Sequence, residues 1–299
     1  MLNEKVIAIT GGAGVLCAAL ARGLVAQGAK VALLDRNLPA AQAIADEINQ
    51  AHAQVAASQA LPQSAAGGNL PCPPVAMAAF CDVLDTAALQ EAHRQVTAQF
   101  GNVDILINGA GGNHPRATTL RETAAPEALL QESGTDETFF GLNRQDMGFV
   151  FDLNILGTML PSQVFGLPMA RRGQGSILNI SSMNAYRPLT KIPAYSAAKA
   201  AVSNFTQWLA VHLAPCGVRV NAIAPGFFVT QQNRALLFDS EGQPTPRAGK
   251  ILAATPMARF GSPEELLGTV TWLLDDAKAG FVTGIIVPVD GGFSAYSGV

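Results

Sequence analysis

The chain has 299 residues, of which 49% are apolar and only 14% carry a charge, and its formal net charge at neutral pH is −3. A chain of this length can bury roughly three quarters of the surface that it exposes when extended, so it needs no disulfide or metal to fold, and we expect a single domain over residues 1–299. There is no basic run, which argues against a nucleic-acid partner, and no apolar run reaches the roughly 18 residues of a membrane helix.

The four cysteines, Cys17, Cys72, Cys81 and Cys216, form no C-x-x-C pair and no metal-ligand spacing with histidine. Free thiols and no bound metal are therefore expected. The first ten residues include an acidic one and enter a short apolar strand at once, which is not the pattern of a secretory signal. These features together predict a cytoplasmic protein.

Short apolar runs alternate with helical patterns along the chain. Strands are expected at residues 5–10, 30–35, 75–83, 103–111, 175–182, 218–226 and 284–290. Helices are expected at 18–29, 39–56, 86–101, about 149–171 and from Tyr195 onward. Strands this apolar, separated by helices, predict an α/β fold, namely a doubly wound Rossmann-type parallel sheet with helices on both faces.

Two segments interrupt this alternation. Residues 57–74 are rich in Gly, Pro and Ser and are interpreted as an exposed excursion. Residues 113–147 form a polar insertion without a clear element, which fits a substrate lid, a subunit contact or a passive surface loop. Phe227, Phe228 and Arg234 mark a second candidate lid after the strand at 218–226.

The first strand runs into a glycine-rich turn. Gly12, Gly14 and Cys17 fall on the spacing G-x-G-x-x-G, in which backbone N–H groups approach a pyrophosphate at a helix N-terminus. The third position needs a small residue, and Cys17 exceeds glycine by only one CH₂ and one sulfur, so we expect the turn to bind a dinucleotide. Asp35 ends the next strand, where a carboxylate binds the adenosine ribose and repels a 2′-phosphate. NAD is favoured, although Arg36 beside it could accommodate NADP.

A second cluster carries the chemistry. Tyr195 and Lys199 are four residues apart, which places them on one face of a helix, and Ser182 ends the preceding strand. A tyrosine has an ordinary pKa of about 10, and a nearby positive charge lowers it toward the range of a useful acid or base. One Y-x-x-x-K is usually an ordinary helix turn, but its place after Ser-Ser and after a dinucleotide turn favours the catalytic interpretation.

The chain is similar to the short-chain dehydrogenase/reductase family over nearly its whole length, through TGGAGVLC, CDV, NGAG, FDLNILGT, NISS, YSAAK, NAIAPG and VPVDGG. The resemblance implies that Tyr195 is the general acid/base, that Lys199 lowers its pKa and binds the nicotinamide ribose, that Ser182 orients the substrate, and that Asn154 holds a water in a proton relay. It further implies the coenzyme contacts Gly11, Gly12, Gly14, Val15, Leu16, Asp35, Arg36, Asp82, Val83, Asn108, Gly109, Ala110, Gly111, Tyr195, Lys199, Ile223, Pro225, Gly226, Phe228 and Thr230. Val15 and Cys17 stand at the second and third glycine positions of the usual T-G-x-x-x-G-x-G, and Gly109 replaces the second Asn of Asn-Asn-Ala-Gly. Val15 is expected of the subgroup described next, so Cys17 and Gly109 are the two departures that it leaves.

Longer stretches, including GAGGNHPRATT and VDGGFSAYSGV, resemble the D-mannonate oxidoreductase (fructuronate reductase) subgroup. This resemblance implies a small-molecule sugar-acid substrate, whose keto group is reduced to a secondary alcohol, and a homotetramer built partly from the helix after Tyr195. That helix also fits a core position within one subunit. The polar loop residues that could bind such a substrate are Asn113, His114, Arg116, Asn184, Arg187 and Lys191.

Other interpretations of these loop residues and of the whole chain stay open. Each loop residue could instead be a surface charge or a backbone cap, and His114 fits a structural role equally well. The chain could also reduce a 3-oxoacyl thioester or a small diketone, or it could be a coenzyme-sensing protein without turnover, an idea that only Cys17 supports.

Overall fold

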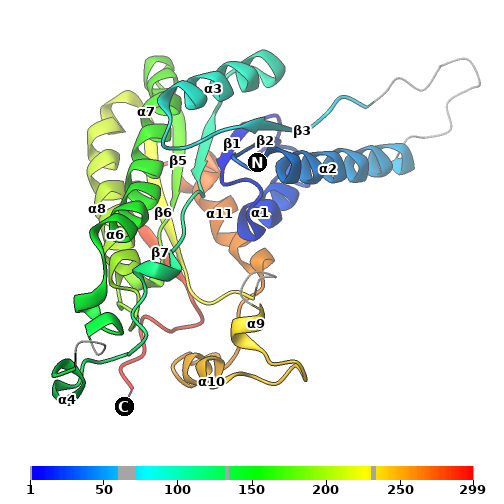
Figure 1. Ribbon diagram of the computed structural model, residues 1–299. Helices are drawn as coiled ribbons and strands as arrows, with labels where there is room; N and C mark the ends of the chain where they lie inside the picture. The colour runs from blue at the N-terminus through cyan, green and yellow to red at the C-terminus, as the bar shows by residue number, and fades with distance from the viewer. Residues whose placement is uncertain (1, 60–71, 132–134, 230–233, 299) are drawn as a thin grey trace, which may run out of the picture.

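A computed structural model describes residues 2–59, 72–131, 135–229 and 234–298 (Figure 1). The strands of these residues form one parallel sheet of seven strands in the order β3-β2-β1-β4-β5-β6-β7. The strands are β1 (Val6–Thr10), β2 (Lys30–Asp35), β3 (Ala76–Phe80), β4 (Ile105–Asn108), β5 (Gly175–Ile180), β6 (Val218–Pro225) and β7 (Ile286–Val289). This order confirms the predicted α/β, doubly wound parallel sheet.

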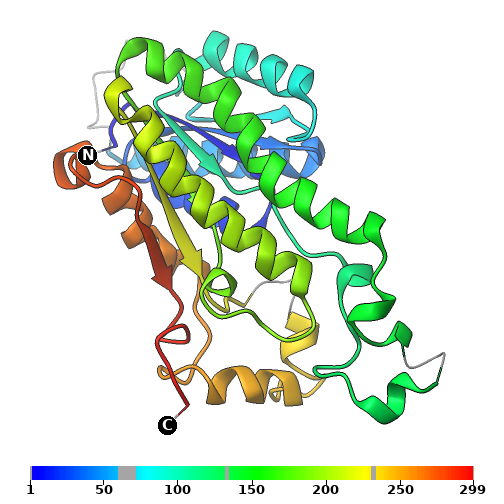
Figure 2. The same cartoon turned by 90° about the vertical axis from the view of Figure 1, so that its left-hand side faces the viewer.

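Helices cover both faces of the sheet (Figures 1 and 2). The helices are α1 (Val15–Val25), α2 (Leu38–Gln59), α3 (Thr86–Phe100), α4 (Pro126–Leu129), α6 (Arg144–Phe151), α7 (Gly157–Arg172), α8 (Pro193–Leu213), α9 (Arg234–Leu237), α10 (Pro246–Ala253), α11 (Leu267–Leu274) and α12 (Asp276–Ala279). Short 3-10 turns are η1 (Pro115–Ala117), η2 (Phe139–Gly141), η4 (Met183–Ala185), η5 (Ala214–Cys216) and η6 (Pro263–Leu266). No helix of the described chain is long and apolar enough to cross a bilayer.

The strands bury both faces, because alternate residues of each strand enter different cores. Ile7 and Ile9 of β1 join a core with α1, α2 and α11. Val6 and Ala8 of the same strand join a second core with α3, α7 and α8. This explains why the strands are continuous apolar runs in the sequence.

The helix expected at about 149–171 is longer and interrupted. It begins at Arg144, because the side chain of Asn143 caps it by accepting a hydrogen bond from the backbone N–H of Asp146 at 2.8 Å. Between α6 and α7 it widens into a π-helical turn, η3 (Asp152–Leu156). Such turns are often found at functional sites, and Asn154 lies in this one.

The two insertions are only partly described. Residues 60–71 of the excursion at 57–74 lie outside the described residues, and residues 57–59 still belong to α2. The insertion at 113–147 was expected to have no clear element. This expectation is wrong, because the insertion contains η1, α4, η2 and the start of α6. Short helical turns of this kind carry too little apolar periodicity to be found from the sequence.

Candidate active site

The glycine-rich turn connects the carboxyl end of β1 to α1. In the sheet β1 lies between β2 and β4. Gly11 has a φ of +65°, and a Cβ on it would lie 2.8 Å from the backbone of Ala110. A Cβ on Gly12 would lie 2.8 Å from Leu33, and the Gly14 N–H donates to the carbonyl of Gly11 at 2.9 Å. The turn therefore needs glycine at positions 11 and 12, and it leads into the N-terminus of α1 as a dinucleotide site requires.

The two departures from the family pattern lie against each other. A Cβ on Gly109 would lie 2.2 Å from the Sγ of Cys17 and 2.8 Å from the carbonyl oxygen of Thr10. Cys17 thus fills the space that a side chain at position 109 would need. Burial, with a smaller contribution from the charge of Asp35, raises the pKa of Cys17 to about 12, so its thiol stays protonated and serves as a packing group.

Asp35 and Arg36 both have partners within the chain. The carboxylate of Asp35 accepts hydrogen bonds from the backbone N–H groups of Ala13 at 3.0 Å and Asn37 at 2.8 Å, so it also holds the turn in place. Arg36 forms an ion pair with Asp82, with 3.6 Å between Nε and Oδ2. The cation that could accommodate a 2′-phosphate is therefore partly neutralised.

The remaining residues for which coenzyme contacts were predicted follow β1, β3, β4 and β6. Val15 and Leu16 open α1, and Asn108 to Gly111 follow β4. The side chains of Val83, Ile223 and Phe228 are buried, and that of Phe228 also lines a hollow described below. Pro225 is also buried, Gly226 packs on Asp290, and Thr230 lies outside the described residues.

The structure brings Ser182, Tyr195 and Lys199 together. The side chains of Tyr195 and Ser182 are close enough to interact, and this interaction lowers the pKa of Tyr195. The Nζ of Lys199 lies 5.7 Å from the centre of the Tyr195 ring and donates to the carbonyl of Ile180 at 2.8 Å. Ser182 at the end of β5 and the two residues of α8 therefore form one cluster, as their spacing predicts.

Burial sets the charges of this cluster. It lowers the pKa of Lys199 to about 8. It also raises the pKa of Tyr195 above its ordinary value, against the smaller effect of the hydrogen bond with Ser182. The lowering of the Tyr195 pKa by Lys199 that the resemblance implies stays a prediction, because burial and Ser182 are the causes of the shift in the chain by itself.

Asn154 lies beside the same cluster and is fully buried. Its amide donates to the carbonyls of Val150 at 2.7 Å and Gly112 at 2.8 Å, and its Oδ1 accepts from the N–H of Gly112 at 3.2 Å. A Cβ on Gly111 would lie 2.8 Å from this Oδ1 and 3.1 Å from the Nζ of Lys199. Gly111 therefore allows β4, α8 and the π-helical turn to meet.

A network of buried polar side chains, which the sequence analysis missed, connects β4, α7, β5 and α8. The amide of Asn108 donates to Ser162 at 2.9 Å and to Asn179 at 2.8 Å, and Asn179 donates to Thr206 of α8 at 2.9 Å. A buried Asn inside an apolar strand was the available signal, because such a group needs partners.

Most residues predicted to bind substrate have partners within the protein. Arg116 and His114 face the buried Asp146, at 3.2 Å and 3.7 Å, which supports the structural interpretation of His114. Arg187 donates to the carbonyl of Ser294 at 3.1 Å, and Asn113 donates to Thr118 at 2.8 Å. Asn184 differs from these four, since it is buried and its Oδ1 accepts no hydrogen bond from any described residue.

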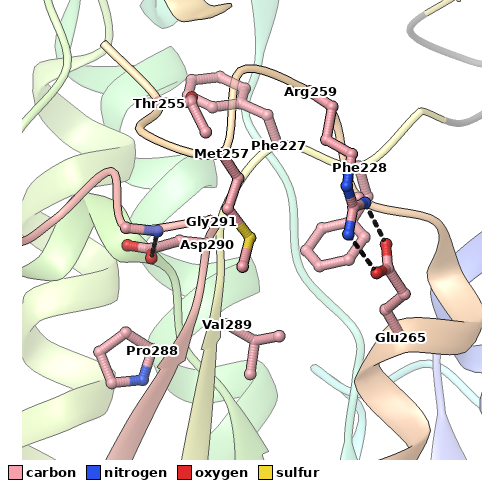
Figure 3. A pocket seen from close by; sticks show the side chains of 12 residues that line it. Phe227, Phe228, Thr255, Met257, Arg259, Glu265, Pro288, Val289, Asp290 and Gly291 are labelled. Atoms are coloured by element: carbon pink, nitrogen blue, oxygen red, sulfur yellow. Dashed lines mark hydrogen bonds and ion pairs between the residues drawn. The ribbon is translucent and has the colours of Figure 1, made fainter.

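A hollow of about 330 Å³ lies beyond the ends of β6 and β7 (Figure 3). Phe227, Phe228, Met257 and Val289 form its apolar walls, and the ion pair of Arg259 with Glu265 lines one side. Phe227 and Phe228 belong to the segment that the sequence marked as a second candidate lid. No group of three or more His, Cys, Asp or Glu within the described ranges could hold a metal ion.

Known proteins show the same pattern. A family model described as enoyl-(acyl carrier protein) reductase matches residues 12–294. UxuB, an uncharacterized oxidoreductase of Bacillus subtilis, is 50% identical over 298 residues, which cover 100% of this chain and 98% of UxuB. A 2-dehydro-3-deoxy-D-gluconate 5-dehydrogenase of Pseudoalteromonas atlantica is 34% identical and covers 71% of this chain and 73% of its own.

The crystal structure of a candidate D-mannonate oxidoreductase from Haemophilus influenzae, with bound NAD, is 51% identical to this chain. It superposes with a TM-score of 0.86 and covers 100% of this chain and 98% of the other. Together with the sheet order and the Ser182, Tyr195 and Lys199 cluster, these likenesses confirm the resemblance predicted from the motifs. The chain belongs to the short-chain dehydrogenase/reductase family of oxidoreductases.

Proposed function

We propose that the protein is an NAD-dependent dehydrogenase that interconverts the keto group of D-fructuronate and the secondary alcohol of D-mannonate. The observation that carries this proposal is the cluster in which the Tyr195 phenol of α8 lies beside the Ser182 side chain and has the Lys199 ammonium 5.7 Å from its ring centre. A coenzyme-sensing protein would have no use for this arrangement. The similarity to a candidate D-mannonate oxidoreductase supports the substrate.

The residues of the turn fit a dinucleotide. Gly11 and Gly12 leave no room for side chains, and Gly111 keeps the space between Asn154 and Lys199 open. NAD is preferred over NADP, because the carboxylate of Asp35 repels a 2′-phosphate and Arg36 is paired with Asp82. The solved relative with bound NAD agrees with this preference.

The nicotinamide, when bound, supplies or accepts the hydride, and this chain's own residues handle the proton. Tyr195 is protonated at neutral pH, because burial raises its pKa, and is therefore ready to donate to the substrate oxygen during reduction. Ser182 holds that oxygen beside the phenol. The Lys199 ammonium stabilises the phenolate left after the transfer.

Two further residues complete the site. Asn154 lies next to Lys199 across Gly111, where it holds a water that returns a proton to the cluster. Asn184 offers a buried Oδ1, unbonded to any described residue, to a substrate hydroxyl. A carbonyl acceptor two residues from Ser182 suits a polyhydroxylated substrate better than an acyl chain.

We further propose that the enzyme is a homotetramer in the cytoplasm. Apolar side chains are exposed along α8 and its neighbours, with Trp208 58% exposed, Val211 78% exposed and Leu167 52% exposed. Exposed apolar groups of this size on neighbouring helices are typical of subunit interfaces. Sedimentation of the purified protein at two concentrations tests this, and a monomer at both would refute it.

The proposed activity is tested by mixing the purified enzyme with D-fructuronate and either NADH or NADPH, and by following the absorbance of the reduced coenzyme. Oxidation with NADH and fructuronate is expected. Oxidation only with 3-oxoacyl thioesters or diketones would move the substrate to another class. Binding of NADH without turnover of a broad carbonyl panel would refute an enzymatic role.

A further inference from the structure

A second hollow, of about 390 Å³, gathers positive charge in a protein whose net charge is −3. It lies between the loop that leads into α8, Phe227, α10 and the carboxyl-terminal tail, and Figure 2 shows α10 crossing below the start of α8. Lys191, Arg247 and Lys250 line it, against one acidic residue, Glu122. A volume of this size suits one small-molecule ligand.

Two of these three cations are left without an ion pair. Lys250 forms an ion pair with Glu122 at 2.8 Å. Lys191 and Arg247 form no ion pair within 4 Å with any residue that the structure describes, and the charge of Lys191 contributes only the smallest part of the lowering of the Glu122 pKa. Of the three cations that the sequence suggested for a carboxylate, Arg116 faces Asp146 and Arg187 bonds to the carbonyl of Ser294, whereas Lys191 has no partner of this kind among the described residues.

The backbone of Lys191 has an uncommon conformation that fits a functional role. Its φ is +74°, in the left-handed region that side chains other than glycine rarely adopt. Its carbonyl accepts a hydrogen bond from the N–H of Thr119 at 2.8 Å, which helps to hold this conformation. Strain of this kind gathers at ligand sites.

Lys191 is also close to the reacting group along the chain. It precedes Tyr195 by four residues, so their Cα atoms are at most about 14 Å apart. The two side chains with a six-carbon substrate between them can span that distance.

Arg247 is placed where it does not help its own helix. It lies in the first turn of α10, and a cation there opposes the helix dipole. Its side chain is exposed, so it contributes little to the core. Across the hollow, the rings of Phe227 and Phe293 pack edge to face, with 5.4 Å between their centres, and form an apolar wall.

We propose that this hollow is the carboxylate end of the substrate site, in which Lys191 and Arg247 bind the carboxylate of a sugar acid while Phe227 and Phe293 pack against its carbon chain. Two cations that converge on a carboxylate give strong charge-assisted hydrogen bonds. The inference rests on the proposed function, because it assigns the charged end of the substrate to a place near the proposed acid, Tyr195.

The test compares D-fructuronate with D-fructose, in which a CH₂OH group replaces the carboxylate. Both are assayed with NADH in the parent, in Arg247→Gln, in Lys191→Gln and in the double variant. Each single variant should lower kcat/KM for fructuronate at least about tenfold, and the double variant should lower it further. The kcat/KM for fructose and the Kd for NADH should change less than about threefold. Arg94→Gln, an exposed change on α3, is the matched control and should change none of these values.

The results separate this inference from the proposed function. If the parent reduces fructuronate and the double variant keeps its preference for fructuronate over fructose, the subsite is wrong and the function stands. If the parent does not reduce fructuronate, the proposed substrate is wrong, and calorimetry of D-mannonate binding to the enzyme with NADH decides the subsite. The subsite is supported if D-mannonate binds the parent and the double variant binds it more weakly. The subsite is overturned if D-mannonate does not bind the parent.

Discussion

The contact between Cys17 and Gly109 gives a prediction that can be worked from the structure. In Gly109→Ala the new Cβ would lie 2.2 Å from the Sγ of Cys17, whereas carbon and sulfur need at least about 3.5 Å. Gly109 is not among the residues with positive φ, so alanine suits its backbone, and the clash alone decides the effect. Overpacking of this kind costs about 1–3 kcal/mol.

A second substitution isolates the clash. Cys17→Ala removes the sulfur and leaves only the contact of 2.8 Å between the new Cβ and the Thr10 carbonyl. In that background Gly109→Ala should cost at least about 1 kcal/mol less than in the parent, which is a coupling typical of residues in contact. Because the turn binds the coenzyme, the Kd for NADH should follow the same pattern.

The free energies of unfolding come from urea denaturation of the four proteins of this cycle, and the Kd from the fluorescence of bound NADH. Gly112→Ala is the matched control in the same loop, since its Cβ would meet nothing within 4 Å, and it should be near neutral. If Gly109→Ala has the same effect with Cys or Ala at position 17, the two residues do not pack against each other, and the explanation of both departures is wrong.

Three further predictions concern the chemistry. Tyr195→Phe should abolish turnover, because no other proposed group donates the proton, while NADH still binds; a rate within a few-fold of the parent would remove Tyr195 from the mechanism. Burial lowers the pKa of Lys199 to about 8, so its ammonium is lost above this pH and the kcat/KM for reduction should fall. A kcat/KM that stays constant up to pH 10 in a stopped assay would argue against a charged Lys199. Asp35→Asn should keep only one of the two backbone hydrogen bonds, because Ala13 donates to Oδ2 and Asn37 to Oδ1 and an amide has a single acceptor oxygen, so the affinity for both coenzymes should fall. The preference for NADH over NADPH, as the ratio of the two Kd values, should still narrow at least about tenfold, because the repulsion of the 2′-phosphate is lost; an unchanged ratio would contradict the role of Asp35.

The sequence predicted well what depends on local pattern. All seven strands were expected, because each is a continuous apolar run, and the order of strands and helices implied the doubly wound sheet. Tyr195 and Lys199 share a helix face by spacing alone, and Ser182 was found because it ends a strand on the same edge.

Contacts between distant residues could not be predicted. Cys17 and Gly109 are 92 positions apart, so the sequence showed two unrelated departures from the family pattern. In the structure the larger residue at position 17 occupies the space that glycine leaves at position 109. The interpretation of Arg116 as a substrate ligand failed to foresee Asp146, because nothing in the sequence shows that this carboxylate is buried beside it.

The sequence suggested Lys191 as a substrate residue, but Arg247 and the hollow that they line together were missed for the same reason. Its two cations lie 56 residues apart, and Arg247 belongs to a short helix after β6 that carries no family motif. Only the fold brings this helix to the loop before Tyr195.

The central claim is that the Tyr195 hydroxyl faces the carbon that exchanges hydride with the nicotinamide. A crystal structure of the enzyme with NADH and D-mannonate tests it most directly. The account predicts the Tyr195 Oη within about 3 Å of the substrate oxygen at the reacting carbon, with that carbon about 3–3.5 Å from the nicotinamide. A substrate oxygen bound away from Tyr195, or a coenzyme bound away from the turn at Gly11 to Gly14, would contradict it.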